Sequence, residues 1–462
     1  MTNPILNTDS YKASHYRQYP AGTEQVFSYV EARGGPYADA LFFGLQAILK
    51  TEFAKPVTRA DIDEAEGLLP AHGLPFNKDG WELLLDRHGG HLPLEIRAQP
   101  EGMIAPVHVP MMTVVNTDPD FFWLTSYVET ALLRVWYPIT VATISHGVRQ
   151  VIRRALVTSA DAPGAELPFK LHDFGARGVS SDQSAALGGM AHLVNFQGSD
   201  TLSAIVAARR FYHEPMAGFS IPAAEHSTIT SWERPNEAAA YANMIQAFGK
   251  PGGLFAVVSD SYDLYNAVEH IWGERLRQSV IDSGATLVVR PDSGDPVEVV
   301  SKTVNLLAER FGTEVNGKGY RVLKNVRVIQ GDGVNPTSIQ AILDRLLSEG
   351  FSASNIAFGM GGALLQKCDR DTMAFAYKAS AAKVNGVWRD VYKDPITDSG
   401  KRSKRGLLGL GEGYRTVAVR DGDFQPVDGG RNWLEPVWRN GELLCDEPLF
   451  VIRQRAAAYD AS

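Results

Sequence analysis

The sequence predicts an α/β protein with two parts: an irregular α/β barrel of parallel strands over residues 151–374, and an additional discontinuous α+β domain built from residues 1–150 and 375–462. From residue 165 to 365, short apolar runs follow one another at roughly 25 to 40 residues, the spacing of strand, crossover helix and next strand. The two flanks lack this spacing and mix helical stretches with proline-punctuated or alternating segments. These two observations give the fold class.

Seven apolar runs are the candidate strands of the barrel. A parallel strand buried on both faces is a short continuous run of Val, Ile, Leu and Phe rather than an alternation of apolar and polar residues. Most of the runs have this composition, and a stretch compatible with a helix follows them. They are residues 169–174, 193–196, 218–221, 254–258, 286–289, 326–329 and 356–358.

The flanks predict a different kind of structure. Alternation of apolar and polar residues at 413–420 favours antiparallel strands. We expect the two flanks to pack together as one domain. Its predicted helices are residues 41–51, 59–69 and 77–87, and its predicted strands include residues 94–98 and 110–116.

Polar residues gather just after the apolar runs. In a barrel of parallel strands, the loops that follow the strands build the active site at one face. Ordinary turns are also rich in Asp and Gly, but Arg and His recur at these positions as well, which favours one shared pocket. The residues are Asp173, Asp200, Glu225, His226, Ser259, Asp260, Arg290, Asp292, Asp332 and the glycines of 359–362.

Charge and cysteine content exclude several classes of protein. With 45 Lys plus Arg against 53 Asp plus Glu, the net charge of -8 offers no global attraction for nucleic acid or anionic lipid. The two cysteines cannot form a disulfide framework and fit a reducing compartment, so we expect a cytoplasmic protein. The uncharged stretches contain prolines and fall short of the ~18 apolar residues of a membrane helix. The N-terminus shows no secretory signal.

Three loops are candidates for phosphate or sugar recognition. The glycine-rich segment 359–362 follows a strand and opens a helix, where backbone N–H groups bind phosphate well, although a tight turn explains it equally. At residues 290–296, Arg290 suits bidentate phosphate recognition, and Asp292 suits a ribose diol or magnesium. A surface ion pair is the alternative. Asp332, between two glycines, suits ribose hydroxyls or a metal.

Other motifs are absent or weak. No G-x-x-x-x-G-K-[ST] and no H-E-x-x-H occurs, so the sequence supports neither a Walker-type site nor this zinc site. His88 and His91 show no acidic or cysteine partner in a zinc-binding sequence pattern, so we expect an ordinary loop there. His226 stands beside Glu225, and a carboxylate neighbour can keep a histidine oriented and nucleophilic.

The combination of motifs resembles the nicotinamide phosphoribosyltransferase family, which has the type II phosphoribosyltransferase fold. The motifs span residues 9–405 in family order, nearly the whole chain. They are DSYKASHY at 9–16, KLHDFGARGVSS at 170–181, AHLVNFQGSD at 191–200, PAAEHST at 222–228, VVSDSYD at 257–263, RPDSG at 290–294, QGDG at 330–333 and KRSK at 401–404.

The resemblance implies a reaction and its partners. The phosphoribosyl group of 5-phosphoribosyl 1-pyrophosphate would pass to nicotinamide, giving nicotinamide mononucleotide and pyrophosphate in NAD salvage. ATP would phosphorylate His226, and Mg²⁺ would assist, with no ligands assigned to it. The enzyme would be a homodimer with its active sites at the subunit interface.

The resemblance also implies roles for individual residues. His226, Glu225 and Asp263 would be catalytic. Phe174 and the partner subunit's Tyr11 would stack on the pyridine ring, with Arg177 and Asp200 at its carboxamide. Ribose and phosphate contacts would be Ser259, Arg290, Asp292, Gly331, Asp332, Gly361, Gly362 and Arg370, and the ATP or pyrophosphate contacts would be Arg33, Lys393 and Lys401.

Asp200 favours the amide substrate by the sign of its charge. A carboxylate accepts hydrogen bonds from the nicotinamide NH₂ and repels the carboxylate of nicotinate. The alternatives are nicotinate phosphoribosyltransferase and a non-catalytic nucleotide-binding protein on the same scaffold. Ala176 and Met360 depart from the residues of vertebrate relatives, so affinities do not carry over.

Overall fold

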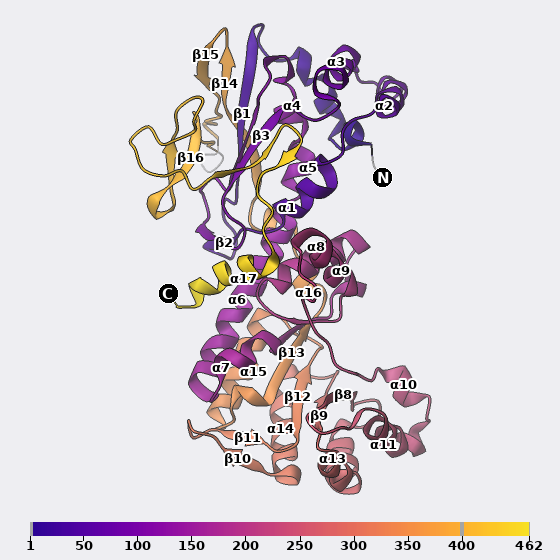
Figure 1. The fold of residues 1–462 in the computed structure, drawn as a ribbon. Coiled ribbons are helices and arrows are strands. Elements are labelled where there is room, and N and C mark those ends of the chain that lie inside the picture. Colours follow the sequence, from indigo (N-terminus) through magenta and orange to yellow (C-terminus); the bar gives the residue numbers. More distant parts are fainter. Residues whose placement is uncertain (1–2, 398–401, 462) are drawn as a thin grey trace. The chain divides into compact units, whose positions relative to one another are not determined.

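A computed structural model describes residues 3–397 and 402–461 and divides the chain into two compact units (Figure 1). Unit 1 consists of Met1–Thr143, Arg210–Glu214 and Cys368–Ser462, and unit 2 of Ile144–Arg209 and Pro215–Lys367. Unit 1 is thus formed by both ends of the chain.

Unit 2 is built on six parallel strands. Their order is β7-β6-β13-β12-β9-β8, and all of them are parallel. The carboxyl ends of the strands therefore lie together along one side of the sheet, which is called the carboxyl edge below. The central strands are buried on both faces, as continuous apolar runs require. The strands are β6 (Leu171–Asp173), β7 (Gly198–Ser199), β8 (Leu254–Val258), β9 (Thr286–Arg290), β12 (Val326–Gln330) and β13 (Ile356–Met360), beside a separate hairpin of β10 (Thr313–Val315) and β11 (Arg321–Leu323).

Residues 219–224, called the closing segment, connect the two outermost strands of this sheet, β7 and β8. Ser199 N–H of β7 donates to Phe219 C=O at 3.0 Å, and Ala224 N–H donates to Ala256 C=O of β8 at 2.9 Å. Phe219 forms a parallel bridge to Gly198, and Ala223 forms one to Ala256. The sheet therefore closes into an irregular barrel.

Helices follow the strands, and their ends are set by local sequence. Asp295 caps the amino end of α14 by accepting from Val297 N–H and Glu298 N–H. Asn335 and Ser338 form a capping box on α15, which packs on α14. The helices are α6 (Trp136–Ser159), α7 (Pro163–Glu166), α8 (Asp182–Leu193), α9 (Leu202–Tyr212), α10 (His226–Thr230), α11 (Glu237–Phe248), α12 (Leu264–Asn266), α13 (Arg277–Ser283), α14 (Pro296–Phe311), α15 (Pro336–Ser348) and α16 (Gly362–Leu365).

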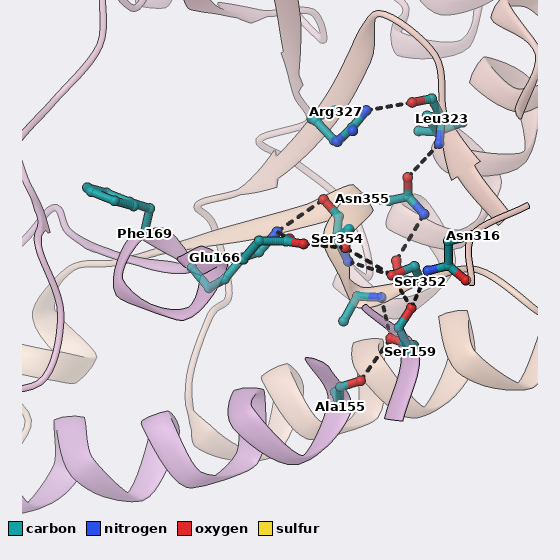
Figure 2. A network of polar contacts seen from close by, with 12 residues as sticks. Ala155, Ser159, Glu166, Phe169, Asn316, Leu323, Arg327, Ser352, Ser354 and Asn355 are labelled. Atoms are coloured by element: carbon teal, nitrogen blue, oxygen red, sulfur yellow. Dashed lines mark hydrogen bonds and ion pairs between the residues drawn. The ribbon is translucent and has the colours of Figure 1, made fainter. Parts of the chain in front are cut away.

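A polar network lies at the amino ends of the strands, opposite their carboxyl ends (Figure 2). Ser159 Oγ accepts from Ala353 N–H at 2.9 Å, and its carbonyl accepts from Ser352 at 2.7 Å. Lys170 Nζ, just before β6, donates to Ser354 C=O at 3.0 Å and pairs with Glu166 at 3.1 Å. These contacts stabilise the amino end of the barrel, opposite the carboxyl edge.

Unit 1 is an α+β domain around a seven-stranded antiparallel sheet of order β15-β14-β1-β5-β3-β18-β19. β1 pairs with β14, so the first and last parts of the chain share one sheet. The strands are β1 (Thr23–Glu31), β3 (Leu94–Ala98), β5 (Met112–Asn116), β14 (Ala376–Val384), β15 (Val387–Asp390), β18 (Glu435–Arg439) and β19 (Glu442–Leu443), with the pairs β2 (Asp39–Leu41) and β4 (Ile104–Pro106), and β16 (Leu408–Gly411) and β17 (Arg415–Ala418).

The helices of unit 1 contribute to one apolar core with the sheet. Trp81, Trp123 and Tyr127 meet edge to face at its centre. The helices are α1 (Leu45–Ile48), α2 (Arg59–Ala71), α3 (Lys78–His88), α4 (Leu124–Tyr127), α5 (Glu129–Leu133) and α17 (Leu449–Ala457). Within the described ranges, no helix has the length and apolar character that crossing a bilayer demands.

The predicted fold class is confirmed, because a parallel barrel and a discontinuous α+β unit are both present. The strands expected at 254–258, 286–289, 326–329 and 356–358 lie within β8, β9, β12 and β13. The strand expected at 193–196 is wrong, since Leu193 ends α8 and the next strand is the two-residue β7. The run at 218–221 forms only the bridge at Phe219.

Glu101 is a buried carboxylate in unit 1. It accepts from Gln46 N–H at 2.7 Å and from Tyr212 Oη at 2.9 Å. Burial raises the pKa of Glu101 to about 7. Between the pKa values of the unfolded and folded states, only the unfolded state releases the proton, so stability falls as pH rises through this window.

We expect Glu101→Gln to remove this pH dependence. Relative to wild type, the free energy of unfolding of the variant should rise by up to about 1.4 kcal/mol per pH unit between the two pKa values. Urea unfolding at pH 5, 6 and 7 measures this difference. If the free energies of unfolding of the two proteins changed with pH in parallel, this would contradict the raised pKa of Glu101.

Candidate active site

The carboxyl edge of the barrel brings most of the predicted residues of unit 2 together. Each lies in the loop after a different strand, or in the loop after the closing segment. Phe174 follows β6, Asp200 follows β7, Glu225 and His226 follow the closing segment, Ser259 follows β8, Asp292 follows β9, Gly331 and Asp332 follow β12, and Gly361 and Gly362 follow β13.

The Phe174 ring lies against two glycines of neighbouring strand ends. A Cβ atom at Gly359 would be 1.9 Å from Phe174 Cε2, and one at Gly331 would be 3.5 Å away. Beneath the ring lies the apolar interior of the barrel, formed by Ala256, Val288 and Ile329. The glycines therefore provide the space in which this flat aromatic surface sits at the carboxyl edge.

Asp200 lies next to the strand that carries Phe174. Its N–H donates to Asp173 C=O at 3.0 Å, and its Oδ1 accepts from the Ser220 hydroxyl. Arg177, in the loop after Phe174, is exposed and has no ion pair within the described part of the chain. The loops after β6 and β7 thus carry an aromatic ring, a carboxylate and a cation.

His226 is held by Asp260, which the sequence placed among the residues of the shared pocket without giving it a role. His226 Nε2 lies 3.1 Å from Asp260 Oδ1, and Nδ1 lies 3.9 Å from Asp292 Oδ2. Asp260 Oδ2 accepts from Asp292 N–H at 3.0 Å and from Ser293 Oγ at 2.6 Å. One carboxylate therefore joins the histidine to the loop after β9.

Three other predicted residues have contacts elsewhere. Glu225 accepts from Ser227 Oγ, and Asp263 caps α12 by accepting from Asn266 N–H at 3.0 Å. Ser259 is fully buried, and its hydroxyl bonds Val257 C=O and Trp272 Nε1. Neither Glu225 nor Asp263 bonds His226 in this structure, so their catalytic role stays a prediction.

Unpaired polar atoms mark the loops after β9 and β12. Arg290 Nη2 lies 3.2 Å from Asp292 Oδ2, whereas its buried Nε has no hydrogen bond in the described structure. Buried Gln330 Oε1 likewise has none, although Gln330 Nε2 donates to Asp332 C=O at 2.8 Å. Buried donors and acceptors left without partners are costly, which is consistent with a polar ligand here.

Unit 1 contains a separate cluster of cations. Burial lowers the pKa of Lys378, on β14; the charge of Glu129 opposes this shift, and three neighbouring cations add to it. These are Arg33, Arg370 and Lys393. Such a cluster suits a polyphosphate. Lys378 was not predicted, and only the pairing of β1 with β14 brings it close to Arg33.

The remaining predicted residues are Tyr11 and Lys401. Tyr11 belongs to the helical turn Ser10–Arg17, is 57% exposed, and meets His15 edge to face at 5.1 Å. Lys401 lies outside the described residues. Tyr11 is thus an aromatic side chain free to contact a further group.

No preformed metal centre is found in the described ranges, because no three His, Cys, Asp or Glu residues there are grouped to hold an ion. Mg²⁺ in phosphate-handling enzymes is commonly held by one or two carboxylates together with substrate phosphates. Asp332 is exposed and its carboxylate has no partner among described residues, so the residues fit a Mg²⁺ that is held jointly with substrate.

These features are those of an α/β-barrel protein whose loops at the carboxyl edge suit a phosphorylated ligand and a flat ring. The model of the nicotinate phosphoribosyltransferase (NAPRTase) family matches residues 169–435, and that of the nicotinamide phosphoribosyltransferase N-terminal domain matches residues 3–96. The chain belongs to the nicotinamide phosphoribosyltransferase family, which confirms the resemblance seen in the motifs.

Relatives and solved structures agree with this membership. A nicotinamide phosphoribosyltransferase of Xanthomonas campestris is 58% identical over 99% of both chains, and one of Acinetobacter baylyi is 33% identical over 98% of this chain and 97% of its own. A human nicotinic acid phosphoribosyltransferase structure, 20% identical, has a TM-score of 0.58 and covers 98% of this chain and 93% of its own. A nicotinate-nucleotide pyrophosphorylase from Pyrococcus furiosus, 16% identical, has a TM-score of 0.61 with coverages of 99% and 96%. These two structures support the fold.

We expect Gly359→Ala to displace the Phe174 ring. The added methyl group would overlap the ring, and a shift of about 1 Å in a positioning group can cost on the order of 100-fold in rate. Steady-state kinetics should show a large rise in KM for the flat substrate. Gly164→Ala, in α7 with no atom within 4 Å of its added Cβ, is the matched control. Unchanged kinetics in the Gly359 variant would contradict this placement of Phe174.

Proposed function

We propose that the chain transfers the phosphoribosyl group of 5-phosphoribosyl 1-pyrophosphate to nicotinamide, giving nicotinamide mononucleotide and pyrophosphate. Family membership supports the reaction class. The observation that carries the choice of substrate is the position of Asp200, bonded to the residue before Phe174 at 3.0 Å. A carboxylate is thereby fixed beside the proposed aromatic platform.

The chemistry of the pyridine pocket favours an amide. Phe174 offers a face for stacking on a flat ring. Asp200 Oδ2 has no hydrogen-bond partner in the part of the chain that the structure describes, so it can accept from the carboxamide NH₂. A carboxylate ligand at this position would meet a like charge, which costs several kcal/mol.

The neighbouring loops suit the sugar and its phosphates. Arg290 has an unpaired buried Nε, and the carboxylate of Asp332 has no protein partner among the described residues. Breaking the bond between C1 and pyrophosphate produces an oxocarbenium-like sugar and a highly charged leaving group. Cations aimed at that developing charge stabilise the transition state. The Arg33, Arg370, Lys378 and Lys393 cluster supports binding of such polyphosphates.

His226 is the proposed acceptor of the γ-phosphoryl group of ATP. Asp260 at Nε2 can hold a proton on that nitrogen, which leaves the Nδ1 lone pair available as nucleophile. ATP would release ADP on forming the phosphohistidine, and water would later remove the phosphate. Because Asp260 also bonds Asp292 N–H, a phosphate on His226 would be sensed by the adjoining loop.

Mg²⁺ is the proposed metal, held jointly by Asp332 or Asp292 and substrate phosphates. When bound, it would neutralise charge on the leaving pyrophosphate. No dedicated protein cage is needed for a metal that arrives with its phosphates.

A homodimer and a cytoplasmic location complete the proposal. Helix α9 exposes Leu202 by 76% and Val206 by 65%, and this spacing places both on one helix face. Exposed apolar side chains of this kind support contact with a second copy of the chain. The partner subunit's Tyr11 would then complete the pyridine site. The two cysteines, both free, support a reducing compartment.

A product assay tests the substrate. Purified protein with Mg²⁺ and 5-phosphoribosyl 1-pyrophosphate should form mononucleotide from nicotinamide and far less from nicotinate. Asp200→Asn and Asp200→Ser should lower this amide-to-acid ratio by at least about tenfold, because the repelling charge is gone.

The outcomes of this assay are distinct. Preference for nicotinate in the wild-type enzyme would assign it to the acid substrate, and absence of either product would favour a nucleotide-binding protein. An unchanged ratio in both Asp200 variants would refute the role of that carboxylate.

We expect His226→Ala to abolish stimulation by ATP while some basal transfer remains. The variant lacks the nucleophile, so ATP should change kcat/KM by less than about twofold. Asp260→Asn, which keeps a side chain of the same shape, should show intermediate coupling. Measuring ADP release and mononucleotide formation together gives the coupling ratio. Full coupling in the alanine variant would exclude the phosphohistidine.

A further inference from the structure

Asp173 is a fully buried carboxylate at the end of β6, which the sequence placed at the shared pocket without giving it an individual role. It has 0% relative exposure and directly precedes Phe174. β6 lies between β13 and β7, whose following loops carry Gly361 and Asp200. Asp173 is therefore central to the pyridine pocket without being able to reach solvent.

The side chain of Asp173 closes a turn around Phe174. Its Oδ1 accepts from Gly175 N–H at 2.7 Å, which is the hydrogen bond of an Asx turn. Phe174 N–H donates to Met360 C=O at 3.1 Å. The backbone on both sides of Phe174 is thus fixed, and the ring is directed against Gly359 and Gly331.

The backbone of Asp173 also fixes Asp200. Its carbonyl accepts from Asp200 N–H at 3.0 Å, next to the pairing of Asp173 with Ser199. One residue therefore closes the turn around the aromatic platform with its side chain and bonds the backbone N–H of Asp200, whose carboxylate is proposed to select the amide, with its carbonyl.

Stability alone does not explain an acidic side chain here. Asp173 Oδ2 is buried and has no hydrogen bond to a described residue, and a Cβ at Gly189 would lie only 3.1 Å from it. Burial raises the pKa of Asp173 to about 6; the nearby Thr201 hydroxyl and Gly175 N–H oppose this rise, although the Thr201 hydroxyl forms no hydrogen bond by distance and angle to a described residue. A buried carboxylate with an unpaired oxygen lowers stability, so another gain must offset it.

We propose that Asp173 is a positioning residue of the pyridine pocket, which directs the Phe174 ring through its hydrogen bond to Gly175 N–H. It touches no substrate itself. The inference rests on the proposed function, because it assumes that Phe174 stacks on nicotinamide. The side-chain bond of Asp173 to Gly175 N–H can be tested separately from its backbone bond to Asp200, because every substitution at this position keeps the backbone carbonyl.

Two variants of the full-length enzyme separate the turn from the charge. Asp173→Asn keeps an Oδ1 acceptor for the Asx turn, whereas Asp173→Ala removes it. We expect Asn to leave KM for nicotinamide within about threefold of wild type and Ala to raise it at least tenfold, while KM for 5-phosphoribosyl 1-pyrophosphate changes less than about threefold. Asp173→Ser, whose hydroxyl closes the same turn more weakly, should lie between them.

An equal rise in the KM for nicotinamide in the Asn and Ala variants would overturn the proposal, because the charge of Asp173 would then matter and the turn would not. A uniform loss in kcat and in both KM values would also overturn it, since that is the result of a purely structural role. If the alanine variant does not fold, the comparison of Ser with Asn decides in the same way. Failure of the proposed function is distinguishable: the wild type would then form no nicotinamide mononucleotide, and titration calorimetry with nicotinamide would still rank the variants.

Discussion

Parallel pairing of six short strands is the constraint on which the rest of unit 2 depends. Because all the strands run in one direction, their carboxyl ends meet at one edge, and loops far apart in sequence become neighbours. Asp260 shows the result: one carboxylate bonds His226 from one loop and Asp292 from another. The polar network at the amino ends holds the opposite edge, so the stabilising contacts and the proposed chemistry occupy different ends of the same sheet.

The sequence predicted the elements whose burial leaves a strong pattern. β8, β9, β12 and β13 are continuous apolar runs, so their positions could be predicted from the sequence. β7 is Gly198–Ser199, which has no apolar signal, and the apolar run before it belongs to the end of α8. A helix end and a short buried strand have the same composition over four residues, and only tertiary pairing distinguishes them.

Site residues divide in the same way. The loops with Phe174, Asp200, His226 and Arg290 could be predicted because each motif is local. Asp260 was placed in the shared pocket, but its bonds to His226 and Asp292 could not be predicted. Lys378 was not predicted at all. In both cases the contacts arise between different strands. The net charge of -8 gave no indication of the cation cluster of unit 1, because a sum over the chain is insensitive to where charges lie.

The closing segment has a consequence for motion. Only a few backbone bonds join it to β7 and to β8, whereas β9 and β12 are each paired along both sides. Regions with few ordered backbone bonds open locally at lower free energy than the core. Asp200 accepts a hydrogen bond from Ser220 within this segment, and His226 follows the segment, so a local opening event there would loosen contacts of both residues together.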